Sequence, residues 1–438
     1  MNIGKKSFIH PLLVIGLLFF VFGFLTWVNG ILIPYFKICM ELSNFQATLV
    51  AFCSYFAYFV MALPSAYVLK ITGYRKGMVW GMCVMAVGTL LFIPAAYLRT
   101  YPLFLTGLFV TATGLALVQT AANPYIAIMG PIEGTAQRIG YMGIANKVAG
   151  IVCLFVLGNV FLADADVLSE SIKGLSEAQK AAALDLYALK IVNPYIIISL
   201  VLLGVALLVH FSRLPEVEEK KDTLDSKGNV AKDRKSVLEY PYLVFGVIAL
   251  FLAGACETVP IDGIIIYSRG LGIPMDVARH LSTYTLFIML LGYLAVSILV
   301  PRFTSQSSVL LFASIWGIIL TLITYFTDGI YSAYSMLLLG FSASMLWGGI
   351  WGLSLRNLGG HTKKGSAILI MSLIGGGVFT VMFGDLLDGN TSNPQVSVLI
   401  LIPCYLFILF YAIKGNRMDY WTLKMPVSSA NKEGISSN

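Results

Sequence analysis

Charged side chains are scarce in this chain. Only 12% of its 438 residues are Asp, Glu, Lys or Arg, whereas 58% are hydrophobic. A soluble globular domain carries about 25% charged residues, so the composition excludes an ordinary soluble protein. The formal net charge is +7, but the charges cluster between apolar runs. That distribution is typical of membrane-protein loops and not of a nucleic-acid-binding surface, so we expect no nucleic-acid partner.

Side chains that build metal, redox or hydrolytic centres are also few. The six cysteines show no metal-ligand spacing and lie mostly inside apolar runs, which favours small buried residues over a disulfide framework. The four histidines fall near the ends of those runs, without a Ser/His/Asp or His/Glu spacing. A glycine-rich ATP-binding loop is absent from the sequence as well. We therefore expect no enzyme, no metal and no cofactor.

Long apolar runs are what the chain has in abundance. A helix that spans a bilayer takes ~20 residues, and about twelve runs meet that length. The first run starts near Phe8 and is too long for the apolar core of a cleavable signal peptide. We therefore expect an all-α membrane protein with twelve transmembrane helices. The runs are Phe8–Phe36, Phe45–Leu69, Met78–Leu98, Pro102–Met129, Ile139–Leu162, Pro194–Phe211, Tyr242–Ile266, Leu281–Val300, Val309–Phe326, Ala333–Leu355, Ser366–Leu387 and Pro394–Ile413.

The basic residues between the runs predict how the chain crosses the membrane. Of the 29 Lys and Arg residues, 21 fall on the side of the two termini, seven fall on the other side, and Lys147 lies inside a run. Because cytoplasmic loops carry the excess of positive charge, both termini are expected in the cytoplasm. The predicted organisation is an N-terminal six-helix bundle (1–212), a cytoplasmic linker (213–237), a C-terminal six-helix bundle (238–415) and a cytoplasmic tail (416–438).

One loop on the predicted outer side is long and acidic. Ala163–Lys190 is too polar to span a membrane. Within this loop, the stretch SEAQKAAALDLYALK predicts a surface helix that lies on the outer face.

The fourth run carries amide side chains at membrane depth. From Gly107 to Gly130 it has no charged residue, yet it contains Gln119 and Asn123, with Pro124 directly after. Residues four apart share one face of a helix, and polar side chains inside a membrane usually face a bundle interior or a wet cavity. We therefore predict that both amides line a binding cavity. The alternative is that they only hold neighbouring helices together.

Three charged residues lie inside apolar runs. Each costs at least ~2.5–3.5 kcal/mol at the centre of a membrane helix, so each needs a role or a partner. Lys147 lies in the fifth run, and Glu257 and Asp262 flank Pro260 in the seventh. A helix break at Pro260 is predicted to turn both acids toward one cavity, and a second break is predicted in the first run, before Pro34. The alternatives are a Lys147–Glu257 ion pair that holds the bundles together and, for Asp262, a solvated helix end.

Two tryptophans complete the predicted site. Trp347 and Trp351 are four residues apart in the tenth run, with glycines beside them. Indole faces suit the apolar C–H faces of a sugar ring, while amides and carboxylates bind its hydroxyl groups in pairs. The alternative is that these indoles serve packing or an interfacial belt.

Several short motifs resemble those of one family. Gln119-Thr120-Ala121-Ala122-Asn123-Pro124-Tyr125, followed by Gly130-Pro131, resembles the fourth-helix signature of the fucose permease / glucose–galactose transporter family of the major facilitator superfamily. Similar motifs follow the family in chain order: Asn44-Phe45-Gln46-Ala47, Leu355-Arg356-Asn357-Leu358-Gly359 and Ile374-Gly375-Gly376-Gly377. The resemblance implies a two-bundle, alternating-access sugar symporter in a bacterial inner membrane. It also implies a sugar site that contains Asn29, Gln119, Asn123 and Asn146.

The chain departs from that family at two positions. Fucose permeases have Asn-Asp-Ile-Leu where this chain has Asn29-Gly30-Ile31-Leu32, and Glu where it has Gln119. Both acids linked to proton coupling there are absent, so we expect a glucose-, galactose- or mannose-type hexose more than fucose as the substrate.

The departures also bear on the coupling ion, which we expect to be H⁺ or Na⁺. Glu257 is the first candidate to bind it and Asp262 the second, with Lys147 as the neighbouring charge. A permanent Lys147–Glu257 pair would instead favour a facilitator without ion coupling, and an L-fucose permease is the other alternative. We expect a monomer surrounded by lipid.

Overall fold

Long helices make up the described part of the molecule. A computed structural model describes residues 9–128, 135–212, 236–299, 304–356, 358, 362–418 and 420–421. Regular structure within these ranges is helical, with no strand. Eleven helical segments there are long and apolar enough to cross a membrane, by length and composition alone. α13 (Met275–Leu299) is a further long helix of 25 residues that packs against both α7 and α15. The predicted all-α membrane architecture is confirmed.

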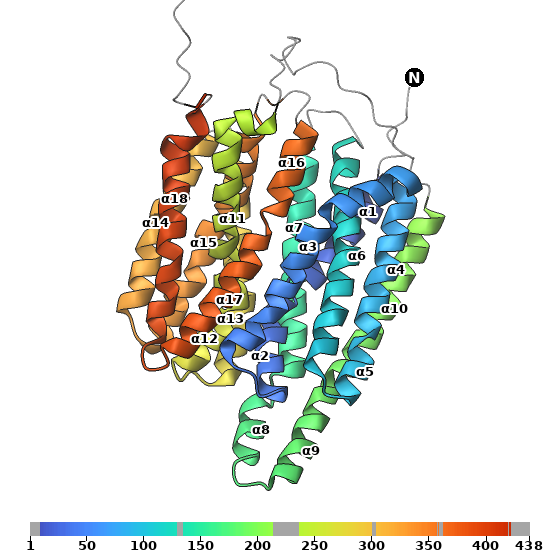
Figure 1. Cartoon of the computed structure of the whole chain (residues 1–438), viewed down its shortest axis with the longest axis vertical. Helices are drawn as coiled ribbons and strands as arrows, with labels where there is room; N and C mark the ends of the chain where they lie inside the picture. The colour runs from blue at the N-terminus through green and yellow to red at the C-terminus, as the bar shows by residue number, and fades with distance from the viewer. Residues whose placement is uncertain are drawn as a thin grey trace, which may run out of the picture.

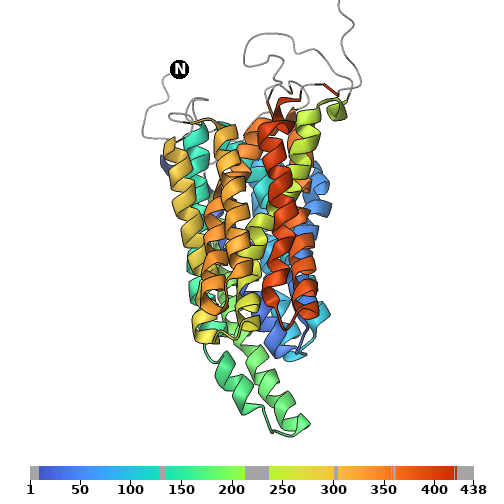
Figure 2. The ribbon, with the colours of Figure 1, turned by 90° about the vertical axis from the view of Figure 1, so that its left-hand side faces the viewer.

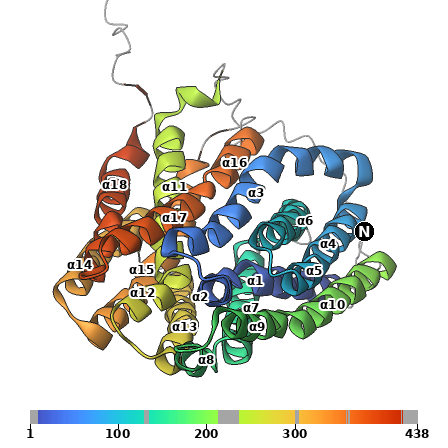
Figure 3. The same cartoon turned by 60° about the horizontal axis from the view of Figure 1, so that its bottom comes forward.

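The two halves of the chain form two groups of helices that lie side by side (Figure 1). The first half contains α1 (Ile9–Thr26), α2 (Asn29–Cys39), α3 (Asn44–Thr72), α4 (Tyr74–Leu90), α5 (Phe92–Tyr97), α6 (Tyr101–Ile128), α7 (Thr135–Phe161), α8 (Ala165–Ser171), α9 (Glu177–Ala188) and α10 (Val192–Phe211). The second half contains α11 (Pro241–Asp262), α12 (Ile264–Gly270), α13, α14 (Gln306–Phe326), α15 (Gly329–Ser354), α16 (Thr362–Met371), α17 (Ile374–Gly389) and α18 (Leu401–Ile413). Contacts between the halves run along α17 with α3 and along α13 with α7 (Figure 3).

Two membrane-crossing segments are broken near the places that the sequence predicts. In the first, α1 and α2 are separated by residues 27–28, which confirms the break expected before Pro34. In the seventh, Pro260 lies inside α11 and the break comes at Gly263, three residues later than predicted. A proline removes one helical hydrogen bond, and the last turn of α11 accommodates that loss. The helix is interrupted instead at Gly263, where a Cβ would lie 2.8 Å from an aromatic ring of α17.

The glycines of the Ile374–Gly377 motif let α17 approach two neighbours. A Cβ at Gly375 would lie 2.0 Å from the carbonyl oxygen of Phe251 in α11. A Cβ at Gly377 would lie 2.9 Å from the Cα atom of Phe52 in α3. Side chains at these positions would push the helices apart, so the motif allows α17 to contact its own half and the other half together.

α8 and α9 form a helical hairpin that projects from one end of the molecule (Figures 1 and 2). The helix predicted in the acidic loop is therefore confirmed as α9, but it stands out from the face instead of lying on it. The reason is that α9 continues through a 3₁₀ turn into α10, as one 35-residue helical segment. The Tyr35 hydroxyl donates to the carbonyl oxygens of Tyr187 (3.0 Å) and Ala188 (2.8 Å). We call this end of the molecule the hairpin face and the other end the opposite face.

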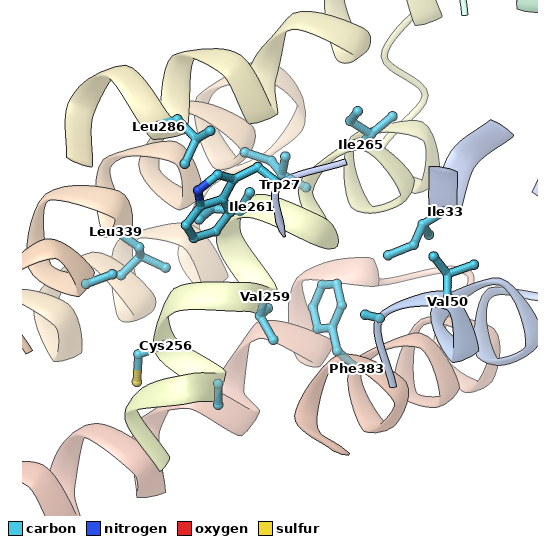
Figure 4. Close-up of a cluster of buried hydrophobic side chains, with 14 of the residues drawn as sticks. Trp27, Ile33, Val50, Cys256, Val259, Ile261, Ile265, Leu286, Leu339 and Phe383 are labelled. Carbon is cyan, nitrogen blue, oxygen red and sulfur yellow. The ribbon is translucent and has the colours of Figure 1, made fainter. Parts of the chain in front are cut away.

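The buried core joins the two halves toward the hairpin face. One cluster links α2, the first turns of α3 and the last turns of α7 to the second half. Figure 4 shows part of it, with Ile33 and Val50 of the first half near Val259 and Phe383 of the second. A second buried cluster, around α1, α4 and the middle of α6, contains residues of the first half alone. The halves therefore pack most closely at the hairpin face.

Two carboxylates bind helix ends across this interface. Asp388 of α17 accepts hydrogen bonds from the first two backbone N–H groups of α3, at 3.0 and 2.8 Å. Asp166 of α8 accepts a hydrogen bond from the first backbone N–H of α13 at 2.6 Å and pairs with Arg269 at 2.9 Å. A carboxylate at a helix N-terminus satisfies unpaired N–H groups and interacts favourably with the helix dipole. Each half thus caps a helix of the other half at the hairpin face, beside an outer cavity of about 400 Å³.

Candidate functional site

One ion pair joins the two halves in the interior of the fold. Lys147 of α7 places its Nζ atom 3.0 Å from Oε1 of Glu257 of α11. The Lys147 side chain is 6% exposed and the Glu257 side chain 20% exposed. Separating such a pair would leave an uncompensated buried charge, which keeps the partners together. The structure therefore brings together the two opposite charges that the sequence puts in separate runs, as the ion-pair alternative expects.

Trp27, in the break between α1 and α2, contacts the lysine of this pair. The ammonium group of Lys147 lies 3.7 Å from the centre of the Trp27 ring and 5.3 Å from that of Tyr293. Both distances fall within the range of a cation–π interaction. The indole N–H of Trp27 donates to Oδ1 of Asn146 at 3.0 Å. Trp27 therefore contacts the amide and the ammonium of two consecutive residues of α7.

The packing of this indole depends on a glycine one turn further along α7. A Cβ at Gly150 would lie 2.4 Å from Cδ1 of Trp27 and 2.7 Å from Cδ1 of Leu286 in α13. Figure 4 shows Trp27 between Leu286 and Ile261, two residues of the second half. Neither Trp27 nor Tyr293 is among the site residues predicted from the sequence. The position of Trp27 in the predicted helix break is a sequence feature that points to the site. No feature of the sequence around Tyr293 does so.

Asn29 begins α2 directly after the break. It is 3% exposed, and its Oδ1 accepts a hydrogen bond from the Ser54 hydroxyl of α3 at 3.3 Å. Both residues line a cavity of about 30 Å³ in the first half, together with Tyr55 and Tyr58. A space of this size holds about one water molecule, so the cavity is too small for a hexose in this conformation.

The amides predicted in the fourth run belong to α6. Gln119 is half-buried there. Asn123 is also part of α6, but its side chain lies outside the described residues. The prediction that both amides face one cavity therefore remains a prediction.

Asp262 ends α11 and is fully enclosed. It is 1% exposed, and neither carboxylate oxygen has a hydrogen-bond partner among the described residues. The alternative of a solvated helix end is therefore wrong, because the second half and α2 cover this position. Five residues of helix put Asp262 ~7.5 Å further along α11 than Glu257, toward the hairpin face. Glu257 pairs with Lys147, whereas Asp262 on the same helix has no hydrogen-bond partner among the described residues.

The two tryptophans of the tenth run stack on one another on α15. The ring centres of Trp347 and Trp351 are 5.4 Å apart, with 19° between the planes. Both side chains are partly buried and pack against the core cluster that the halves share. This arrangement supports the packing alternative, and their contact with a sugar remains a prediction.

Known proteins resemble this chain over most of its length. The family model of the Major Facilitator Superfamily matches residues 15–384. The glucose/galactose transporter of Brucella abortus biovar 1 (strain 9-941) is 31% identical over 420 residues, which cover 94% of this chain and 96% of that protein. The L-fucose-proton symporter of Escherichia coli (strain K12) is 29% identical over 415 residues, 93% of either chain. A crystal structure of a variant of the E. coli fucose:proton symporter, FucP, has a TM-score of 0.68 and 28% identity, covering 93% of this chain and 98% of its own.

Proposed function

This chain belongs to the Major Facilitator Superfamily, and we propose that it is a sugar transporter that imports a hexose together with a cation. Its fold and its relatives are those of transporters and not of enzymes. The observation that carries the proposal is the Lys147–Glu257 pair, because each half contributes one partner. Alternating access needs a site that both halves share, so that rocking one half against the other exposes it to each side in turn.

The polar groups around the pair suit a sugar. Trp27 uses the amide oxygen of Asn146, so Asn146 meets a ligand as a hydrogen-bond donor. The Glu257 carboxylate accepts hydrogen bonds, and its 20% exposure leaves it within reach of a ligand. Asn29, Gln119 and Asn123 are the further amides of the proposed site, with Trp347 and Trp351 as candidate stacking surfaces. Such a mixture of donors, acceptors and aromatic rings is typical of sites for small polar ligands.

The substrate that we propose is a glucose-, galactose- or mannose-type hexose. Relatives named glucose/galactose transporter and L-fucose-proton symporter are similarly identical to this chain, at 31% and 29%. The distinction therefore rests on Gly30 and Gln119, which stand where the resemblance to fucose permeases leads us to expect acids. L-Fucose is the alternative substrate.

Cation symport supplies the energy in this proposal. One positive charge that moves through ~100 mV gains ~2.3 kcal/mol, enough to concentrate a neutral sugar ~40-fold. The alternative is a facilitator, because Lys147 already neutralises Glu257 in this structure.

We assign the hairpin face to the outside of a bacterial inner membrane, with both termini in the cytoplasm. The excess of Lys and Arg on the side of the termini supports this orientation. The halves are closed at the hairpin face, while Glu257 on the other side of the closure is partly exposed. The conformation is then inward-facing, in a protein that works as a monomer in lipid.

Uptake into proteoliposomes tests the proposal. Labelled glucose, galactose, mannose, fucose and N-acetylglucosamine are offered one at a time, first without a gradient and then with a sodium or a proton gradient. We expect exchange of at least one of the first three hexoses, and accumulation with one of the two gradients. Exchange without accumulation under either gradient favours the facilitator, fucose alone favours the fucose permease, and no uptake of any sugar contradicts sugar transport.

A further inference from the structure

Among the described residues, the charges buried around α11 do not balance. α11 carries two acids, Glu257 and Asp262, and Lys147 pairs with Glu257. Among the described residues no basic side chain pairs with Asp262, and neither of its oxygens accepts a hydrogen bond. If both acids are ionised, the buried group of three residues has a net charge of −1. A further positive charge would make it neutral.

The surroundings of Asp262 offer it no substitute for a cation. The Ser282 hydroxyl of α13 donates to the neighbouring carbonyl of Ile261 at 2.6 Å. The Thr258 hydroxyl, one turn earlier, lies within hydrogen-bond distance of the carbonyl oxygens of Gly254 and Gly376. These two hydroxyls are therefore committed to backbone oxygens, and neither donates to the carboxylate of Asp262.

Among the residues that the structure describes, two titratable groups face Asp262. Glu257 lies on the same helix and Tyr55 comes from α3, and both interact electrostatically with the carboxylate. The backbone of α2 approaches α11 at this point, since a Cβ at Gly30 would lie 3.3 Å from the carbonyl oxygen of Ile261. Neither Tyr55 nor Glu257 carries a positive charge, so neither of them compensates Asp262.

We propose that Asp262 holds the coupling cation, one H⁺ or one Na⁺ for each transported sugar. This inference rests on the proposed symport. A carboxylate that is enclosed without a partner is strongly unfavourable unless it takes up a proton or binds a cation. With the cation bound, the three charged residues sum to zero and the carrier reorients without an uncompensated charge. Without the cation the net charge of −1 opposes reorientation, so the sugar moves with the ion.

The geometry favours Asp262 over Glu257 for this role. Glu257 has Lys147 as a partner 3.0 Å away, so its charge is balanced in this structure. Asp262 lies beyond it toward the hairpin face, in the sequence between Ile261 and Ile264 of the buried cluster that the halves share. A permanent Lys147–Glu257 pair therefore does not by itself make the protein a facilitator, because the second acid remains to be neutralised.

The test compares Asp262→Asn with wild type and with Asp385→Asn in proteoliposomes. Asp385 is an exposed acid on α17 and serves as the matched control. Labelled D-glucose is used, or the carried hexose of the panel above, and both exchange and accumulation are measured. We expect Asp262→Asn to keep exchange while its accumulation ratio falls to about one, because the amide is permanently neutral. The control should accumulate as wild type does.

Binding of the same sugar to purified protein covers the case in which Asp262→Asn loses exchange. In wild type, affinity should rise as the pH falls if the ion is H⁺, or rise with added NaCl if it is Na⁺. In Asp262→Asn the affinity should be independent of both. Retained accumulation, a retained cation dependence of binding, or complete loss of sugar binding would each overturn the assignment. If wild type itself exchanges but does not accumulate the sugar, the symport proposal fails and this inference falls with it.

Discussion

Removing one partner of the Lys147–Glu257 pair should cost far more stability than removing both. In Lys147→Met, the carboxylate of Glu257 loses the ammonium that lies 3.0 Å from Oε1. Loss of one partner from a buried pair typically costs ~3–5 kcal/mol. Because 20% of the Glu257 side chain stays exposed, hydration relieves part of this penalty, and we expect a value near the lower limit, about 3 kcal/mol. Glu257→Gln should cost a similar amount, since it strands Lys147.

The double variant Lys147→Met/Glu257→Gln contains no stranded charge. Replacing a whole buried pair with neutral side chains is often close to neutral. The contact of Lys147 with the Trp27 ring is lost as well, at a cost of ~0.5–2 kcal/mol. We therefore expect the double variant to be only about 1–2 kcal/mol less stable than wild type. The coupling energy between the two sites is then several kcal/mol.

Denaturant unfolding of the purified proteins in one detergent measures these differences. Lys173→Met is the matched control, because Lys173 forms an exposed ion pair with Glu170 in the hairpin, with side chains 68% and 72% exposed. Exposed pairs contribute little, so the control should stay within about 0.5 kcal/mol of wild type. If the costs of the two single variants simply add in the double variant, the pair is not the buried, mutually compensated unit described here.

Two further predictions concern the contact of the halves at the hairpin face and the indole of Trp27. Asp388→Asn removes the charge from the cap at the N-terminus of α3 and weakens that cap by about 1–2 kcal/mol. Ile33 is 0% exposed, and a cysteine at this position should therefore react with a membrane-impermeant maleimide ~5–30-fold faster in Asp388→Asn than in the otherwise wild-type protein. The control variant Asp385→Asn should leave this rate unchanged. Equal rates with and without Asp388→Asn would contradict the role of the cap. Trp27→Phe keeps a ring near Lys147 but loses the bond to Asn146, so sugar should bind roughly 5-fold more weakly. Trp27→Leu, which loses both contacts, should bind more weakly still, and equal affinities of the two variants would contradict the cation–π contact.

Most of the architecture can be predicted from the sequence because helices that cross a membrane need long runs of apolar residues. Apolar runs of membrane length predict the helices, and the linker predicts the division into halves. The break before Pro34 is predictable because several polar and small residues gather there. The position of the second break is not, since the last turn of α11 tolerates Pro260 and the interruption depends on the contact of Gly263 with α17.

The candidate site, too, can be predicted from the sequence only in part. Lys147 and Glu257 are predictable as candidates because a lone charge in an apolar run is costly, and each is the simplest partner for the other. The contacts of Trp27 and Tyr293 with Lys147 depend on how α1, α7 and α13 cross, which periodicity does not specify. The caps formed by Asp166 and Asp388 are equally hidden, because an acid near a loop resembles a solvated residue until the other half approaches it.

The steady-state ratio of hexose inside to outside proteoliposomes tests the central claim most directly. With an imposed potential of ~100 mV and the coupling ion present, one charge moved per sugar predicts a ratio of up to ~40, which falls to one when an ionophore collapses the gradient. A ratio of one in the presence of every imposed gradient, for a hexose that the protein demonstrably exchanges, would contradict cation-coupled transport.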